Sequence, residues 1–226
     1  MFVQNSIQYP YTGMAPQLTS SYAQFDNGEN VFTFYDNFAG TSLNTNKWSS
    51  FTGSGASISV NNGITVNGDS SYAGIITLSG FNPSPTIADI YVTNASGKWP
   101  TISMTNGNSN SSDGYFALWS GVNGSFYYGS YSAGINGTGG FTWNYPAILS
   151  ESWQSSSQEI YGSNYAYTNE SFSTYSLPSS VYYGFGSVYL SSSGIITVQW
   201  TRVRALPPNN VMPSNSQPQK TIILVG

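Results

Sequence analysis

Residues 56–67 read ASISVNNGITVN, two short alternating segments joined by an Asn-Gly pair. On both sides of the pair an apolar side chain recurs at every second position, as a half-buried strand requires. Asn62-Gly63 suits a type I′ turn because both residues tolerate a positive φ. We therefore predict a β-hairpin with strands at 56–60 and 64–67.

Working outward from this hairpin, short segments rich in β-branched and aromatic residues, separated by Gly and Asn, fill the chain from residue 31 onward. Further strands are predicted at 31–36, 73–78, 87–93, 115–119, 125–131, 147–152, 158–161, 165–168, 182–190 and 195–204. Helical periodicity is absent over any three turns, although 44–48 could form one short turn. The pattern predicts an all-β fold, an antiparallel sandwich or barrel.

The two ends differ in texture from the middle. Residues 1–30 carry prolines and spaced aromatics without a period, and we interpret them as an extended N-terminal arm. The arm either packs on the main domain as a strap or contacts a neighbouring subunit. Residues 31–206 form the predicted sandwich. Residues 207–226 form a Pro-rich linker and a terminal strand, which completes its own sheet or crosses to another subunit.

Charge is scarce, and this excludes several functions. Only 6% of the 226 residues are charged, with Lys and Arg totalling 5 and Asp and Glu 9, against roughly 25% in ordinary domains. Such a chain lacks the basic patch that nucleic-acid binding needs. Because Cys and His are both absent, thiolate or imidazole metal sites and Ser-His-Asp triads are excluded. No apolar run approaches the roughly 20 residues of a membrane helix, so we predict no membrane span.

The polar residues are mainly Ser, Thr, Asn, Gln and Tyr, whose side chains do not titrate in the acidic range. Folding stability should therefore depend weakly on pH, and we expect a protein that works outside the cell, on a cell surface or in a virion, even in acid. The alternative is a surface simply rich in Ser and Asn. The first 17 residues lack a positive start and an apolar stretch, so either no secretion signal exists or the numbering starts after its removal. Asn-x-Ser/Thr sequons permit glycosylation at Asn94, Asn110, Asn123, Asn136 and Asn169.

The stretch 34–48, FYDNFAGTSLNTNKW, resembles the D-x-F-x-G-T-x-L-x-x-x-K-W opening of concanavalin A-like (laminin-G-like) jelly rolls. Residues 57–67 look like the hairpin that follows it there, and 196–204, ITVQWTRVR, resemble the closing V-D-W-V-R-V-R strand. Gln199 stands where that strand has Asp, and Thr201 where it has Val. The Pro-rich tail resembles that of archaeal surface proteins with this domain. The resemblance implies a jelly-roll β-sandwich over residues 31–226.

These motifs also predict packing. Phe34, Phe38, Leu43 and Trp48 should close one end of the sandwich, with Gly40 allowing the turn. In the last strand Ile196, Val198 and Trp200 should face the core, because alternate residues share a face. Arg202 and Arg204 should continue that face toward the strand end, where solvent or a carboxylate can be reached.

The resemblance also implies what chemistry to look for. Related hydrolases carry E-x-D-x-x-E or E-x-D-x-E on one strand, so that carboxylates converge in a cleft. No predicted strand carries that triplet, and Glu151 with Glu159 across a hairpin is a weak substitute, so we predict no catalysis. Calcium is the one cofactor that the superfamily makes conceivable, with Asp36, Asn37 and Asp113 as weak candidate ligands.

Sugar binding is a further candidate, because carbohydrates stack on Tyr and Trp faces and bond to amides and hydroxyls. The region from 115 to 145 is dense in such residues, although alternation should bury more than half of them. The candidate sugar-contacting residues are Trp119, Tyr127, Tyr131, Trp143 and Tyr145.

Together these observations predict a non-catalytic extracellular structural or assembly protein, a filament, surface-layer or virion subunit of archaeal type. Its expected partners are copies of itself or other surface or virion subunits. The alternative is a carbohydrate-binding adhesion module that uses exposed Tyr and Trp.

Overall fold

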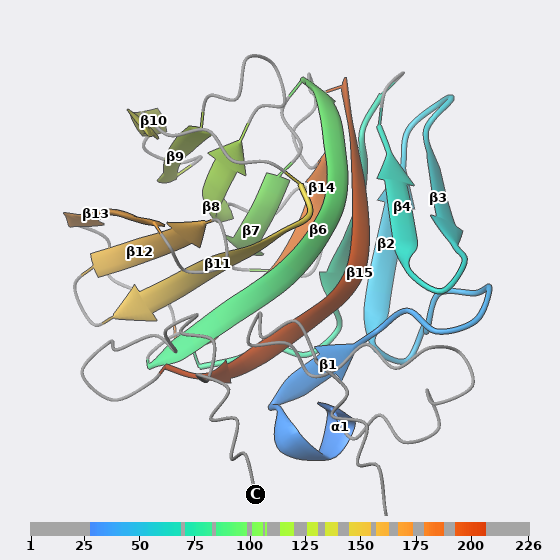
Figure 1. Ribbon diagram of the computed structural model, residues 1–226, viewed down its shortest axis with the longest axis horizontal. Helices are drawn as coiled ribbons and strands as arrows, with labels where there is room; N and C mark the ends of the chain where they lie inside the picture. Colours follow the sequence, from blue (N-terminus) through green and yellow to red (C-terminus); the bar gives the residue numbers. More distant parts are fainter. Residues whose placement is uncertain are drawn as a thin grey trace, which may run out of the picture.

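The structure is a computed structural model and describes residues 28–68, 71–82, 85–98, 101–105, 107, 114–119, 126–130, 134–139, 145–154, 157–162, 167–173, 179–187 and 193–206. Within these ranges the chain forms one short helix and fifteen strands (Figure 1). The elements are α1 (Gly28–Val31), β1 (Phe34–Asp36), β2 (Trp48–Thr52), β3 (Ser57–Val60), β4 (Ile64–Asn67), β5 (Ala73–Thr77), β6 (Thr86–Lys98), β7 (Thr101–Thr105), β8 (Gly114–Trp119), β9 (Phe126–Ser130), β10 (Gly134–Gly139), β11 (Ala147–Gln154), β12 (Ser157–Gly162), β13 (Tyr167–Ser173), β14 (Tyr182–Ser187) and β15 (Ser193–Ala205).

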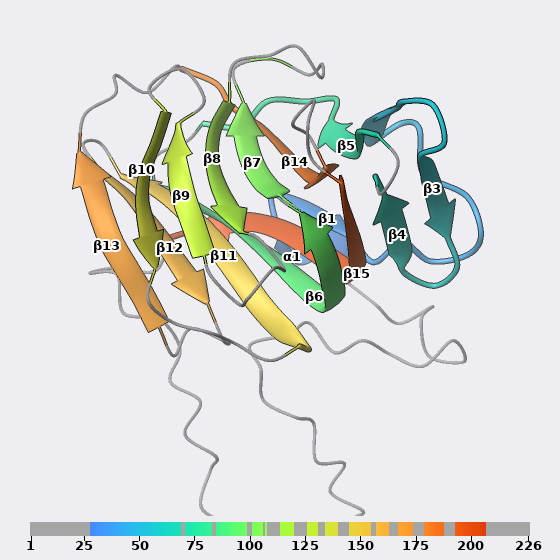
Figure 2. The ribbon, with the colours of Figure 1, turned by 90° about the horizontal axis from the view of Figure 1, so that it is seen from above.

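The strands form two antiparallel sheets that lie face to face (Figures 1 and 2). Sheet A has eight strands in the order β13-β12-β11-β6-β15-β4-β3, with β1 paired beside β15. Sheet B has seven strands in the order β10-β9-β8-β7-β14-β5-β2. The prediction of an all-β, antiparallel jelly-roll sandwich is confirmed.

Most predicted strands are present with shifted ends. The hairpin at 56–67 is confirmed as β3 and β4, and Asn62 at its turn has a φ of 49°. The segment 31–36 is a strand only from Phe34, because α1 occupies Gly28–Val31, a helix that the sequence did not predict. Strands β2, β7 and β10 were also missed, since Ser, Thr and Gly dominate them. The predicted boundary between residues 30 and 31 falls inside α1, and the arm before residue 28 and the tail after residue 206 lie outside the described residues.

The core lies between the sheets, and its members come from alternate positions of both. Large fully buried members include Trp48, Ile64, Ile75, Tyr183 and Phe185. The predicted closure of one end is confirmed. Phe38 and Trp48 belong to the core, while Phe34 and Leu43 pack against it. The rings of Phe34 and Trp48 meet edge to face at 5.1 Å, and Gly40 turns the chain there with a φ of 85°.

One prediction about the last strand is wrong. Ile196 and Val198 do face the core, but Trp200 belongs to a second apolar cluster on the outer face of sheet A. The register of β15 against β6 shifts twice, passing over Thr93 on β6 and Gln199 on β15. A one-residue bulge moves every later side chain to the other face. Arg202 and Arg204 therefore share the outer face with Trp200, and there they do reach a carboxylate.

In the part of the chain that the structure describes, no helix is long and apolar enough to cross a membrane.

Candidate functional site

The strands of sheet B carry no charged residue at all, from β10 through β2. Side chains alternate along each strand, so one set packs in the core and the other faces outward. On β14, Tyr183 and Phe185 are core residues, and Tyr182, which alternates to the outer face, is half-buried. On β2, Trp48 is in the core and Phe51 lies on the outer face. The outward set on these strands carries no charge, but it includes aliphatic residues such as Ile76, which is 2% exposed.

Two aromatic rings form a platform at the β2 edge of this face. The rings of Phe51 and Tyr72 lie 6.4 Å apart with an interplanar angle of 38°, and both side chains are half-buried. Phe51 lies over Gly74, since a Cβ on that glycine would come within 2.5 Å of the ring. Glycine thus lets the ring approach the strand closely, and a half-buried aromatic ring is a surface on which a sugar can stack. We call Phe51 and Tyr72 the aromatic pair.

The aromatic pair stands at one end of a row of positions that crosses the sheet. Directly opposed positions connect Phe51 to Gly74, Gly186, Thr101, Leu118 and finally Tyr127. Phe51 and Tyr127 are separated by five strand spacings, or about 24 Å at the usual distance between strands. Two of the four positions between these ends, Gly74 and Gly186, are glycine, and both are buried.

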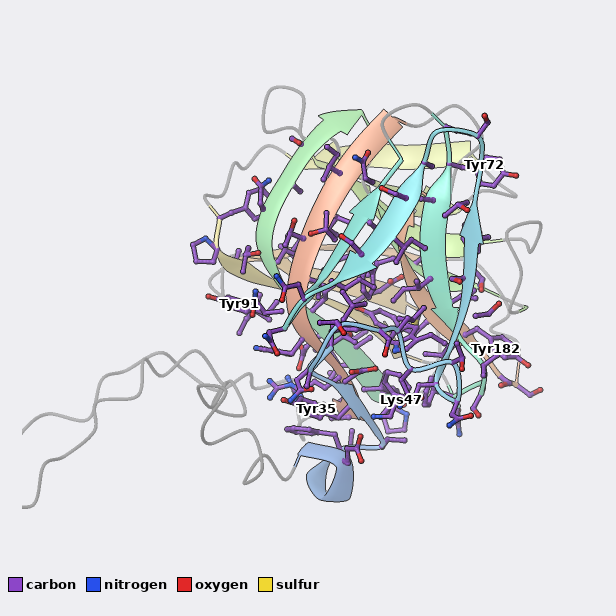
Figure 3. All side chains as sticks on the ribbon, turned by 90° about the vertical axis from the view of Figure 1, so that its right-hand side faces the viewer. Tyr35, Lys47, Tyr72, Tyr91 and Tyr182 are labelled. Atoms are coloured by element: carbon purple, nitrogen blue, oxygen red, sulfur yellow. The ribbon has the colours of Figure 1, made fainter. Side chains whose placement is uncertain are left out.

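Figure 3 shows Tyr72 and Tyr182 on one side of the sandwich and Tyr91 on the other. Tyr182 is half-buried on the same face as the aromatic pair. If the register of β14 against β5 is continued past Gly184 and Ile76, Tyr182 lies opposite the exposed Leu78, which follows β5. The outer face of sheet B therefore carries half-buried aromatic side chains at the β2 edge, from the aromatic pair, and on the inner strand β14, from Tyr182.

Three charged residues, Asp89, Arg202 and Arg204, lie together on the outer face of sheet A where β6, β11 and β15 pair. Asp89 is fully buried, and its Oδ2 accepts hydrogen bonds from Nε of Arg202 and Nε of Arg204, each at 2.7 Å. Ser150 donates to Oδ1 of Asp89 at 2.7 Å, and Thr201 donates to its backbone carbonyl at 3.0 Å. Three strands are thereby joined through one carboxylate.

Burial, the largest single influence, would raise the pKa of the Asp89 carboxyl. The positive charges of Arg202 and Arg204, with hydrogen bonds from Arg204 and Ser150, outweigh burial and lower that pKa below its usual 3.8. Asp89 is therefore ionised over the neutral and mildly acidic range, which does not suit a proton donor for glycoside hydrolysis.

Aromatic side chains close this charged cluster from outside. The guanidinium of Arg202 lies 4.9 Å from the ring centre of Phe32 and 5.0 Å from that of Trp200. Tyr91 stacks on Trp200 at 5.7 Å. Arg202 and Trp200 are 4% and 0% exposed. This cluster is therefore a buried contact that holds the strands together, and it is not open to a ligand.

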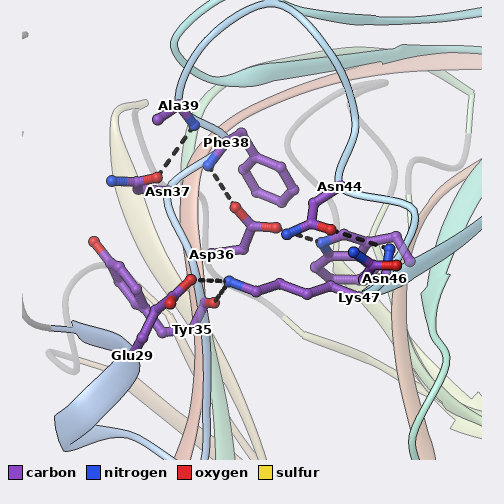
Figure 4. Close-up of polar contacts among 10 residues, drawn as sticks. Glu29, Tyr35, Asp36, Asn37, Phe38, Ala39, Asn44, Asn46 and Lys47 are labelled. Atoms are coloured by element: carbon purple, nitrogen blue, oxygen red, sulfur yellow. Dashed lines mark hydrogen bonds and ion pairs between the residues drawn. The ribbon is translucent and has the colours of Figure 1, made fainter.

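Asp36, a candidate calcium ligand, is engaged by the protein itself (Figure 4). Its Oδ1 accepts a hydrogen bond from the Phe38 amide at 2.8 Å and its Oδ2 one from Nε1 of Trp48 at 2.7 Å. Beside it, Lys47 donates to the Tyr35 carbonyl at 2.9 Å and pairs with Glu29 of α1. Asp36 thus anchors the loop that leads from β1 to β2. Asp113 lies outside the described residues, and no group of three or more Asp or Glu that could hold a metal occurs among the residues described.

Acidic residues do not converge on the strands that the structure describes. Asp89 lies on the outer face of sheet A, whereas Glu151 is opposite Ala88 and shares the core face with it. Glu151 is itself buried, at 1% exposure. Glu159 is opposite Ser152 and not opposite Glu151, so the candidate pair does not meet directly across the hairpin. Two-carboxylate hydrolysis needs carboxyl groups about 5 to 10 Å apart in one cleft.

The predicted sugar-contacting residues fall in several places. Tyr145 is half-buried and packs against the core. Trp119 ends β8 and Tyr127 is in β9, opposite Leu118, while Tyr131 and Trp143 lie outside the described residues. Sequence reasoning missed the aromatic pair. The only available signal was Phe51 and Tyr72 flanking segments rich in Gly and Ser, which is weak.

Comparison with known proteins places the fold. No protein-family model matches the chain. It is 30% identical over 260 aligned residues to uncharacterized protein 562 of Sulfolobus islandicus rod-shaped virus 1; the match takes in the whole chain, which spans only 45% of that protein.

Solved structures of glucanases have the same fold. A laminarinase from Flavobacterium sp. UMI-01 superposes with a TM-score of 0.57 at 10% identity, over 76% of this chain and 99% of that one. The β-glucanase of Bacillus licheniformis gives 0.54 at 12%, over 76% and 97%. A pseudo β-1,3-glucanase of Mycobacterium tuberculosis gives 0.54 at 12%, over 77% and 98%. At these identities the likeness establishes the fold alone, an antiparallel jelly-roll β-sandwich like that of these glucanases.

These neighbours correct the functional prediction. The interpretation as a structural or assembly subunit is wrong, because the fold neighbours are carbohydrate-active proteins, and the carbohydrate-binding alternative fits them better. The prediction that the protein is not an enzyme is not supported either, since hydrolases and a pseudo-glucanase share this fold. The archaeal-surface part of the resemblance has no counterpart among these structures.

Proposed function

We propose that this protein binds a neutral polysaccharide across the outer face of sheet B and does not cleave it. The observation that carries the proposal is the aromatic pair, Phe51 and Tyr72, at the end of an uncharged cross-strand row. An extended sugar chain would stack on this pair and continue along the row toward the position of Tyr127.

The absence of charge on the described strands of sheet B supports a neutral ligand. A uronic or sulfated chain would need Lys or Arg on this face, and the strands carry none. Affinity that comes from ring stacking and hydroxyl hydrogen bonds should change little between low and high salt, because no ion pair is there to be screened.

Binding without cleavage is supported by where the carboxylates lie. The strands of sheet B hold no Asp or Glu, and of the described acidic residues, Asp36 and Asp89 are held by hydrogen bonds within the protein. The fold neighbours include both hydrolases and a pseudo-glucanase, so hydrolysis is an outcome that the experiment must measure.

Isothermal titration against laminarin, a mixed-linkage β-glucan and other neutral polysaccharides, at two salt concentrations, tests the proposal. We expect the wild-type chain to bind. Phe51→Ala and Tyr72→Ala should each raise Kd roughly tenfold, which is a loss of about 1.4 kcal/mol of binding free energy. Tyr91→Phe, on the other sheet, is the control and should bind as wild type. Affinity unaffected by both substitutions, or binding to none of the polysaccharides, would overturn the proposal.

Release of reducing ends from each bound polysaccharide separates the second part of the proposal from the first. We expect none above the background of a heat-denatured sample. Release that persists after repeated purification would show that the protein is a hydrolase and that its carboxylates lie beyond the strands discussed above.

The predicted extracellular location is a further proposal, which rests on the uncharged surface and the low count of titratable groups. An origin among archaeal virus proteins is supported by the identity to the Sulfolobus virus protein.

A further inference from the structure

Asn94 stands on β6 in the sequence Asn94-Ala95-Ser96, on the sheet that does not carry the aromatic pair. Ala95 is part of the core, so its two neighbours face outward from sheet A. Asn94 and Ser96 are both exposed. No described residue makes a hydrogen bond to the Asn94 side chain that its modification would break.

The positions directly opposite Asn94 across the sheet carry small hydroxyl side chains. Directly opposed positions connect it to Thr197 on β15, then Thr65 on β4 and Ser59 on β3. Thr65 and Thr197 hydrogen-bond each other at 3.2 Å. Along β6, the register shift at Thr93 separates Asn94 from Tyr91 and the buried aromatic cluster. The hydroxyl row lies beside the Asn94 amide, and Ile195, half-buried on the same face, is opposite Ser96.

From this geometry we infer that Asn94 carries an N-linked glycan. The amide nitrogen Nδ2 forms a bond to the anomeric carbon of an oligosaccharide carried on a lipid phosphate. The bond from that carbon to the phosphate oxygen breaks, the lipid phosphate leaves, and the amide gives up one proton. Because alternate residues of a strand share a face, Asn94 and the Ser96 hydroxyl are presented together to the transferase.

The glycan would project from sheet A, away from the aromatic pair on sheet B, so it would not compete with the ligand proposed above. The inference stands whether or not that ligand is bound. It concerns Asn94 alone, because Asn110 and Asn123 lie outside the described residues, and Asn136 and Asn169 are described only as backbone positions of β10 and β13.

The chain allows a clean test. Trypsin cleaves after Lys and Arg, and Lys47 and Lys98 bound a peptide, residues 48–98, whose only sequon is Asn94. The other four sequons fall in the next peptide, residues 99–202. The full-length protein is made in an archaeal host whose own surface glycoprotein is shown to be N-glycosylated in the same culture, and both peptides are measured by mass spectrometry.

We expect the 48–98 peptide to carry a hexose-containing mass increment in the wild-type chain. The increment should disappear completely in Asn94→Gln and in Ser96→Ala, and persist in Ser96→Thr, which keeps the sequon. Thermal unfolding of each variant confirms that it is folded. A 48–98 peptide found only unmodified in the wild-type chain, beside the glycosylated host protein, would overturn the inference, as would an increment that survives Asn94→Gln.

Discussion

Replacing Asp89 by asparagine tests how this nearly uncharged protein uses its few charges. The change keeps the size of the side chain and removes the negative charge that Arg202 and Arg204 both contact at 2.7 Å. The side chains of Asp89 and Arg202 are 0% and 5% exposed and that of Arg204 is 15% exposed, so neither arginine can recover its hydration without opening the sheet.

The expected cost follows from that burial. Breaking a buried ion pair by removing one partner costs about 3–5 kcal/mol, because a charge is left buried without compensation. We expect Asp89→Asn to lie in this range, measured as the free energy of unfolding in urea at pH 7. Ser150→Ala removes one hydrogen bond to the same carboxylate and should cost only about 1–3 kcal/mol.

The pH dependence gives a second and independent signature. The pKa of Asp89 is lower in the folded chain than its usual 3.8, so its contribution is fully present above pH 3.8 and is lost as the pH falls through the folded value. Wild-type stability should therefore be nearly constant from pH 7 to about pH 4 and fall below that. Asp89→Asn should be less stable throughout and lack that part of the acid fall.

Urea unfolding of both proteins from pH 7 to pH 2.5 measures the two signatures together. A variant within 1 kcal/mol of wild type at pH 7, or an acid fall of equal size in both proteins, would refute the reasoning that Asp89 holds β6, β11 and β15 together.

Three further substitutions probe other contacts. Trp48→Phe removes the indole donor to the buried Asp36 and should cost about 1–3 kcal/mol in urea unfolding; an unchanged midpoint would contradict the anchor. Gly63→Ala forces a side chain into a φ of 135° and should lower stability by about 1–3 kcal/mol, seen as a lower melting temperature; wild-type melting would argue against strain at this turn. Gly74→Ala puts a Cβ within 2.5 Å of the Phe51 ring and must displace it. Polysaccharide affinity should therefore fall although the ring is still present. Undiminished affinity by titration would mean that the position of the ring is unimportant.

The fold class was within reach of the sequence because alternation and turn chemistry are local. Asn62-Gly63 and the alternating residues around it specify β3 and β4 without help from the rest of the chain. Strands such as β7 and β10 were missed, because segments of Thr, Ser and Gly become strands only when neighbouring strands satisfy their backbone groups.

The candidate site was much less accessible. Phe51 and Tyr72 are not close in sequence, and their pairing depends on β2 lying beside β5 with Gly74 beneath the ring. The predicted sugar-contacting residues were chosen by density of aromatics in one region, and density does not reveal which face of a strand is exposed.

By itself, the sequence determined that the fold is of the all-β class, that the chain has no imidazole or thiol chemistry, and that its polar residues carry little charge, since composition and period-two alternation need no partner to be recognised. Only the tertiary structure decided that Trp200 faces outward and that Asp89 receives Arg202 and Arg204 from more than a hundred residues away. The physical reason is that the register shift at Gln199 reverses the side of every later side chain of β15, and a bulge exists only once two strands are paired.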